Sequence, residues 1–158
     1  MKLVYIVKIK FKEISNKSET KDLINFTPSE STVCASHVGR AGGIQKIVLA
    51  SRCKKGSTMH EILHALGVWH EQSRGDRDLY IKILWHNIKE EKKYNFSQHL
   101  NDGQDVGQYD YQSIMHYGEF AFSKNGQVTI VPLQENQKIG QRDNLSYLDI
   151  QAINKIYN

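Results

Sequence analysis

Three histidines within one short segment have the spacing of a metal site. The segment reads His60-Glu61-Ile62-Leu63-His64-Ala65-Leu66-Gly67-Val68-Trp69-His70. On a helix, His60 and His64 lie about one turn apart on the same face, so both imidazoles can bind one metal ion. Glu61 follows His60 directly and can lean over the same ion without being a ligand.

The third histidine needs a break in the helix before it can join the other two. His70 would point away from the ion if the helix continued, but Gly67 accepts a left-handed backbone, ends the helix and lets the chain turn back. Three imidazoles leave a fourth position open, as in catalytic zinc sites, whereas structural zinc is closed by four protein ligands. The five-residue pattern arises by chance in such a chain about once in 10⁵. We therefore expect a catalytic site with one Zn²⁺ per chain.

Three other histidines, His37, His86 and His99, lack this pattern. They are predicted to be ordinary surface or core residues, not ligands.

Short strands and two helices are predicted around this segment. Alternating apolar residues predict a strand over 7–11, and apolar runs predict strands over 22–26, 46–50 and 79–84. One helix is predicted over 58–67, with Ser57 as its N-cap, and a second over 146–157. Strands dominate the first half and helices are few, which indicates an α+β fold.

Length and composition favour one globular domain and exclude several functional classes. The chain has 158 residues, 39% hydrophobic and 24% charged, which is typical of a single globular domain. No apolar run is long enough to span a membrane, and no export signal is recognised at the start. The net charge of +4 is not gathered in one block, and the run Lys89–Lys93 mixes both signs, so we predict a solvated helix face and no nucleic-acid partner.

The two cysteines, Cys34 and Cys53, allow two interpretations. Their spacing is not the Cys-x-x-Cys of a zinc knuckle or redox motif. They are either two buried thiols of an intracellular protein or one disulfide that closes a modest loop, worth roughly 3 kcal/mol. Composition does not decide between them.

The metal segment and its surroundings resemble the astacin family of metzincin zinc metalloproteases. His-Glu-x-x-His-x-x-Gly-x-x-His is the metzincin zinc motif, and residues 71–78 are similar to its astacin continuation. The later run Ser113-Ile114-Met115-His116-Tyr117 resembles the astacin Met-turn. Residues 36–45 and 139–154 are similar to the strand ahead of the zinc helix and to the closing segment of the family.

This resemblance implies the catalytic roles. His60, His64 and His70 would bind zinc, and Glu61 would be the general base for a water activated by the metal. Tyr117 would ligate zinc at rest and swing out to stabilise the oxyanion.

Other matched positions would shape the cleft. Met115 would form an apolar floor under the metal. Ser36, His37 and Val38 would belong to the edge strand where an extended peptide adds by backbone pairing. Arg142 would border the pocket for the residue after the cleaved bond, where its guanidinium could bind an acidic side chain. The alternative is an ordinary surface arginine paired with Asp143 or a nearby acid.

The resemblance also bears on architecture. It implies an upper lobe with a mixed sheet and the zinc helix, and a lower lobe with the Met-turn and a C-terminal helix. Cys34 and Cys53 match a family disulfide. Residues 1–158 would form one peptidase domain whose N-terminal part is missing, so that Met1 begins too late to reach Glu71, where the family buries its mature N-terminus.

The function expected from the resemblance is zinc-dependent endopeptidase activity on proteins or peptides. A truncated, catalytically silent module that keeps the zinc site and grips extended peptides is the alternative. A purely structural zinc protein is disfavoured, because Glu61 and the open ligand position have no use there. A secreted location is expected from the family, and the sequence does not give the oligomeric state.

Overall fold

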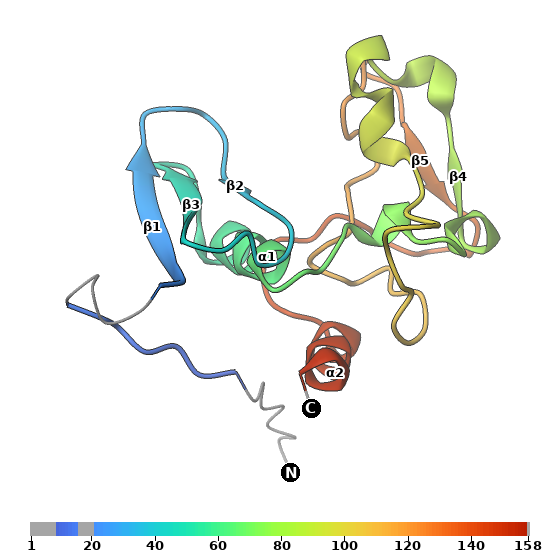
Figure 1. Ribbon diagram of the computed structural model, residues 1–158. Coiled ribbons are helices and arrows are strands. Elements are labelled where there is room, and N and C mark those ends of the chain that lie inside the picture. The colour runs from blue at the N-terminus through green and yellow to red at the C-terminus, as the bar shows by residue number, and fades with distance from the viewer. Residues whose placement is uncertain (1–8, 16–20, 158) are drawn as a thin grey trace.

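Two groups of elements flank a central helix in the computed structural model, which describes residues 9–15 and 21–157. We name residues 21–66 the N-terminal lobe and residues 70–157 the C-terminal lobe. Figure 1 shows the sheet of the N-terminal lobe on one side of helix α1 (Lys55–Ala65), the two-stranded sheet of the C-terminal lobe on the other, and helix α2 (Tyr147–Ile156) beneath them. The expected two-lobed α+β architecture is confirmed.

The N-terminal lobe contains a mixed sheet, as expected. Its strands are β1 (Leu23–Ser29), β2 (Ala35–Ser36) and β3 (Ile44–Ala50). The order is β1-β3-β2, with β1 parallel and β2 antiparallel to β3. The central strand buries Ile47 completely and Ala50 almost completely.

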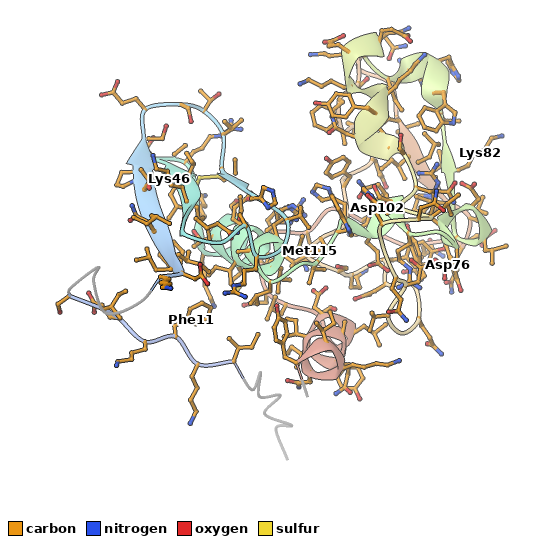
Figure 2. The ribbon with its side chains drawn as sticks, viewed as in Figure 1. Phe11, Lys46, Asp76, Lys82, Asp102 and Met115 are labelled. Atoms are coloured by element: carbon orange, nitrogen blue, oxygen red, sulfur yellow. A yellow bond between two sulfur atoms is a disulfide. The ribbon has the colours of Figure 1, made fainter. Side chains whose placement is uncertain are left out.

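The strand expected over 7–11 is not borne out where it can be examined. Residues 7 and 8 lie outside the described residues, and residues 9–15 contain no strand. Phe11 is 60% exposed and lies away from α1 (Figure 2), so the apolar alternation there does not reflect burial in a sheet.

Helix α1 (Lys55–Ala65) begins earlier than predicted. Its N-cap is Lys54, without a side-chain cap, and Ser57 lies inside the first turn, so the predicted cap is wrong. The main-chain N–H and the hydroxyl of Thr58 both donate to the Lys54 carbonyl, at 3.0 and 3.2 Å. Gly56, in the first turn, lies close to Arg142: a Cβ on Gly56 would lie 1.6 Å from the Arg142 carbonyl oxygen.

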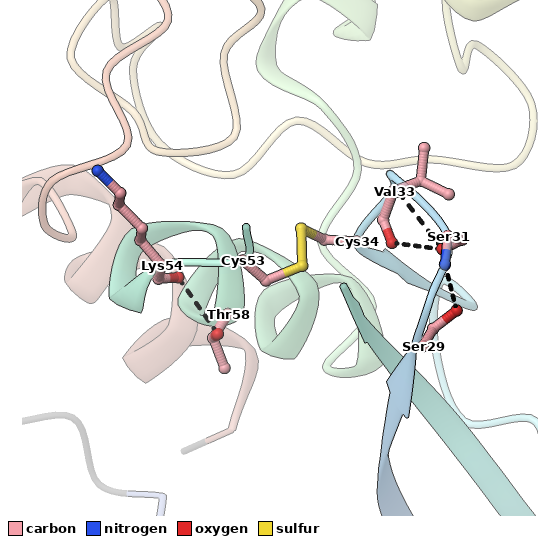
Figure 3. Close-up of a disulfide and its surroundings, with 7 residues drawn as sticks. All are labelled: Ser29, Ser31, Val33, Cys34, Cys53, Lys54 and Thr58. Atoms are coloured by element: carbon pink, nitrogen blue, oxygen red, sulfur yellow. Dashed lines mark hydrogen bonds between the residues drawn. A yellow bond between two sulfur atoms is a disulfide. The ribbon is translucent and has the colours of Figure 1, made fainter. Parts of the chain in front are cut away.

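A disulfide ties this helix to the sheet. Cys53, just before α1, is bonded to Cys34, just before β2 (Figure 3). The structure therefore selects the disulfide over two free thiols.

The C-terminal lobe consists of short helices and one pair of antiparallel strands that are far apart in the sequence. The 3-10 helices are η2 (Glu71–Ser73), η3 (Arg77–Leu79), η4 (Trp85–Asn87) and η5 (Glu90–Phe96). Strand β4 (Ile81–Ile83) lies within the strand predicted over 79–84 and pairs antiparallel with β5 (Ile130–Pro132). No local pattern predicted β5. The charged run Lys89–Lys93 leads into the 3-10 helix η5, where the ammonium group of Lys93 lies 2.7 Å from the exposed carboxylate of Glu90. Buried apolar side chains fill this lobe: Ile81, Ile83, Ile88, Phe96, Tyr109, Tyr111 and Ile130.

Helix α2 (Tyr147–Ile156) closes the chain within one residue of its predicted ends. Ser146 caps it through a capping box in which its hydroxyl accepts from the Asp149 N–H and the Asp149 carboxylate accepts from the Ser146 N–H. Its buried Ile153 joins Leu63 of α1 and Met115 in a second core cluster under the three histidines.

Both α-helices are short, with 11 residues in α1 and 10 in α2. Among the residues that the structure describes, no helix is both long enough and apolar enough to cross a bilayer.

Candidate metal centre and active site

His60, His64 and His70 converge as their spacing predicts. The Nε2 atom of His70 lies 3.2 Å from Nε2 of His64 and 3.3 Å from Nε2 of His60. One ligand atom from each of the three lies within 4.8 Å of the others, so the group could hold a single metal ion. His60 and His64 are each 6% exposed.

Main-chain carbonyls orient two of these rings. His60 Nδ1 lies 2.8 Å from the Ile114 carbonyl oxygen, and His64 Nδ1 lies 2.9 Å from that of Val68. A carbonyl only accepts, so each Nδ1 carries the proton and each Nε2 presents its lone pair toward the other histidines. This is the usual arrangement around histidine ligands of metals.

Gly67 provides the turn that brings His70 back. Its φ is +90°, a left-handed conformation that glycine adopts without strain. The N–H groups of Gly67 and Gly39 both donate to the His64 carbonyl at 2.8 Å, and Val68 N–H donates to that of Leu63 at 3.0 Å. The helix therefore ends as the sequence predicts, and its terminal carbonyls are satisfied.

Burial keeps the three imidazoles neutral. It lowers the pKa of His60 to about 3, with the charges of His64 and Arg142 as further causes. Burial likewise lowers the pKa of His64, and lowers that of His70 well below its ordinary value. Neutral imidazole is the form that binds Zn²⁺, so this donor set fits the ion.

Glu61 lies beside the histidines and is also buried. Burial raises its pKa to about 7, against the lowering effects of Arg142 and of a hydrogen bond from the Ser36 main chain. The carboxyl group therefore lies between α1 and β2, and its pKa is near neutrality, as a general base requires.

Met115 and Tyr117 belong to the turn that packs against α1 and the histidines. Met115 is fully buried against α1, at the centre of the molecule (Figure 2). The Tyr117 ring centroid lies 4.4 Å from that of His70, with Phe96 and Phe122 at 5.7 and 5.5 Å. Burial raises the Tyr117 pKa to about 12, so its phenol stays protonated at neutral pH.

Arg142 faces the site rather than open solvent. Its Nη1 donates to the carbonyl oxygens of His116 and Gln141 at 2.9 and 2.7 Å. Its charge affects the pKa values of both Glu61 and Tyr117. Among the described residues no carboxylate forms an ion pair with Arg142, so the expected alternative, a surface pair with Asp143, is absent there.

The predicted edge strand is shorter than expected. Ser36 belongs to β2, whereas His37 and Val38 follow the strand. His37 is exposed and remains outside the histidine group. β2 pairs with β3 along one edge, and its other edge lies on the Glu61 side of the sheet.

Glu71 lies behind the metal centre. Its Oε1 accepts from the Asp110 N–H at 2.8 Å, and burial raises its pKa to about 8. It lines a cavity of about 510 Å³ together with Asp110, Asp149 and Trp69. The expectation about Met1 lies outside the described residues.

Two contributors to the site were not foreseen. Gln72 is fully buried and binds the Tyr117 main chain, and no local sequence signal reveals this. The Asp149 carboxylate accepts from the Ser113 hydroxyl at 2.7 Å and the Ile114 N–H at 3.0 Å, supporting the turn whose carbonyl holds His60. The Ser-x-x-Asp capping signature at 146–149 could have indicated that Asp149 is engaged.

Known proteins are similar to this chain in sequence and in fold. The family model of the astacin peptidases matches residues 6–158. Zinc metalloproteinase nas-13 of Caenorhabditis elegans is 46% identical over 140 residues, covering 87% of this chain and 31% of that protein. Astacin-like metalloendopeptidase of Mus musculus is 44% identical over 142 residues, covering 87% of this chain and 32% of that protein. The chain thus spans about a third of the length of these relatives.

A solved structure has the same fold. High choriolytic enzyme 1, a hatching enzyme zinc-protease from Oryzias latipes, superposes with a TM-score of 0.84 at 40% identity. The match covers 94% of this chain and 73% of that one.

Proposed function

The chain belongs to the astacin family of peptidases, and on that premise we propose that it is a zinc-dependent endopeptidase that hydrolyses peptide bonds in proteins. The observation that carries the proposal is a neutral histidine triad, with Nε2 atoms within 3.3 Å of His70, directly beside the buried carboxyl of Glu61. We propose that His60, His64 and His70 hold the zinc ion. When bound, zinc supplies a Lewis acid that polarises a carbonyl and acidifies water.

Glu61 is the proposed general base. Above its pKa of about 7 the carboxylate takes a proton from the attacking water, and the resulting acid then delivers that proton to the leaving amine. The Ser36 main chain, which donates to Glu61, keeps the carboxyl directed at the cleft.

Tyr117 is the proposed oxyanion donor. Its high pKa keeps the phenol O–H available, and a donor aimed at developing negative charge is worth about 10²–10³ in kcat. The ring lies against His70, within reach of the substrate carbonyl that approaches the histidines.

Substrate binding is proposed along β2 and at Arg142. An extended peptide would add to the strand containing Ser36 and continue past His37 and Val38, as in other cases of strand addition. Among the described residues, Arg142 donates to main-chain carbonyls through Nη1, and its Nε and Nη2 are the groups proposed to bind a substrate carboxylate. We therefore propose a preference for Asp or Glu after the cleaved bond, lost in Arg142→Ala and measured by cleavage-site profiling of a peptide library.

A secreted location and a single peptidase domain over 1–158 accompany the proposal. Members of the family are typically secreted, and the Cys34–Cys53 disulfide suits an oxidising compartment. The alternative, a silent peptide-binding module, shares every one of these residues and is separated only by turnover.

Hydrolysis of a casein-type substrate tests the proposal. We expect turnover that a zinc chelator abolishes and added zinc restores. Glu61→Gln should keep one zinc per chain and lose several orders of magnitude in kcat, because the amide cannot take the proton. A zinc-loaded parent without turnover would favour the silent module, and near-normal proteolysis by zinc-loaded Glu61→Gln would remove Glu61 from the mechanism.

A further inference from the structure

Gln72 is a buried amide between the third histidine and the tyrosine. It lies in η2, two residues after His70, and has no exposed surface. Its side-chain Oε1 accepts from the Tyr117 N–H at 3.1 Å, and its Nε2 donates weakly to the Ser73 hydroxyl at 3.4 Å.

Further bonds make this junction rigid. The N–H of Glu71 donates to the Met115 carbonyl at 3.2 Å, so the η2 segment and the turn before Tyr117 are joined at two successive points. The main-chain carbonyl of Gln72 accepts from Arg77 Nη1 at 2.9 Å, and Arg77 is 4% exposed. Gln72 is therefore held on one side by a buried guanidinium while it holds Tyr117 on the other.

Within the described residues 9–15 and 21–157, the Tyr117 phenol has ring contacts but no hydrogen bond comparable to that of its main chain. Its ring touches His70, Phe96 and Phe122 through aromatic faces and edges, which resist rotation less than directed hydrogen bonds do. The hydroxyl position therefore depends on where the Tyr117 main chain is fixed relative to His70.

We propose that Gln72 is a positioning residue that fixes the main chain of Tyr117 relative to the third histidine, and thereby sets the position from which the phenol would reach a metal held by the histidines or a substrate oxyanion. This inference rests on the proposed function, because Tyr117 carries its effect. Gln72 touches neither substrate nor metal.

Two variants test the two side-chain hydrogen bonds of Gln72 separately. Gln72→Met keeps an unbranched side chain of similar length and removes the acceptor for Tyr117 N–H. Ser73→Ala is the matched control, because it removes only the partner of Gln72 Nε2 and leaves the bond to Tyr117. If Gln72→Met does not fold, Gln72→Asn, which keeps the amide on a shorter side chain, takes its place on every readout.

A double-mutant cycle with Tyr117→Phe is the kinetic test. We expect Gln72→Met to lower kcat by about 10- to 100-fold with KM nearly unchanged, less than the 10²–10³ for loss of an oxyanion donor itself. In the Tyr117→Phe background the same change should cost less than about twofold, because effects of residues that act through one group do not add. Ser73→Ala should keep the parent kcat.

A spectroscopic signature provides a readout without turnover. A Cu²⁺ ion loaded in place of zinc would lower the pKa of a coordinating phenol, so that Tyr117 would bind it as phenolate and give a visible charge-transfer band. Tyr117→Phe should abolish this band, and Gln72→Met should weaken or shift it. Parent-like kcat in Gln72→Met, full additivity with Tyr117→Phe, or an unchanged copper band would each overturn the positioning role. If Tyr117→Phe itself keeps full activity, the proposed oxyanion role fails separately, and the copper band still decides whether Gln72 places Tyr117.

Discussion

At the scale of single residues, burial acts in opposite directions on the bases and acids of this site. It lowers the pKa of His60 to about 3 and raises the pKa of Glu61 to about 7 and of Glu71 to about 8. Each group is thereby driven toward its neutral form. For the histidines this is the form that binds a metal, so the fold itself prepares the site for zinc.

Zinc retention in acid follows from the lowered histidine pKa values. A proton and zinc compete for the same Nε2 lone pair, and a lower pKa means that the proton competes only at lower pH. We therefore expect zinc to be released on the acid side of the ordinary histidine value of about 6.5, with near one zinc per chain still bound at about pH 5. Metal analysis after equilibrium dialysis across a pH series measures this, with near-UV circular dichroism as the control for unfolding. Half-release at about pH 6–6.5 from a folded chain would contradict it.

The sequence predicted the residues whose chemistry depends on local spacing. Helix geometry places His60 and His64 on one face, and the left-handed conformation that glycine accepts predicts the turn at Gly67. Gln72 could not be foreseen, because its partner Tyr117 is 45 residues away and an isolated glutamine carries no pattern. The Arg142 contact with the His116 carbonyl is equally non-local.

At the scale of elements, the same distinction applies. Helix α2 was predicted closely because Ser146 and Asp149 form a local capping box. The start of α1 was misplaced because its N-cap, Lys54, has no side-chain cap, so the sequence carries no local signal at the true start and Ser57 was a misleading one. Strand β5 was missed because three residues show no usable alternation and acquire their structure by pairing with β4.

Asp149 connects the end of the chain to the metal site. Its carboxylate accepts from Ser113, Ile114 and the N-terminus of α2 at 2.7–3.0 Å, and the Ile114 carbonyl in turn holds His60. We expect Asp149→Ala to lower the free energy of unfolding by about 3–4 kcal/mol, because several buried donors lose their acceptor. Urea unfolding measures the loss.

Ser146→Ala is the matched variant for this helix. It removes the capping hydroxyl, which also donates to the Asp110 carboxylate, and leaves the Asp149 bonds to Ser113 and Ile114. It should therefore cost about 1–2 kcal/mol, less than Asp149→Ala. Equal losses in the two variants would show that Asp149 acts as part of the cap alone and does not support the turn before Met115.

At the scale of the whole molecule, the metal site lies where the two lobes meet. His60 and His64 come from α1 in the N-terminal lobe, whereas His70 begins the C-terminal lobe. The C-terminal lobe has its own apolar cluster around Phe96. In the part of the chain that the structure describes, the sheet of the N-terminal lobe has three strands, one of them two residues long. This lobe therefore depends more on its covalent link than the other does.

That link is the Cys34–Cys53 disulfide, which joins the start of β2 to the start of α1 across 19 residues (Figure 3). A loop of this size is worth about 3 kcal/mol, which in a chain of this length corresponds to roughly 6–12 °C in Tm. We expect thiol titration of the native protein to find no free thiol until reductant is added, and calorimetry of Cys34→Ala/Cys53→Ala to show a Tm lower by that amount. Reductant should leave the Tm of the double variant unchanged.

Because the histidines are held by α1 and the turn at Gly67, the folded double variant should still bind one zinc. Its KM for extended peptides should rise, because β2 is no longer linked to α1. Two reactive thiols in protein made under oxidising conditions, or a Tm equal to that of the parent, would show that the N-terminal lobe does not need the bond.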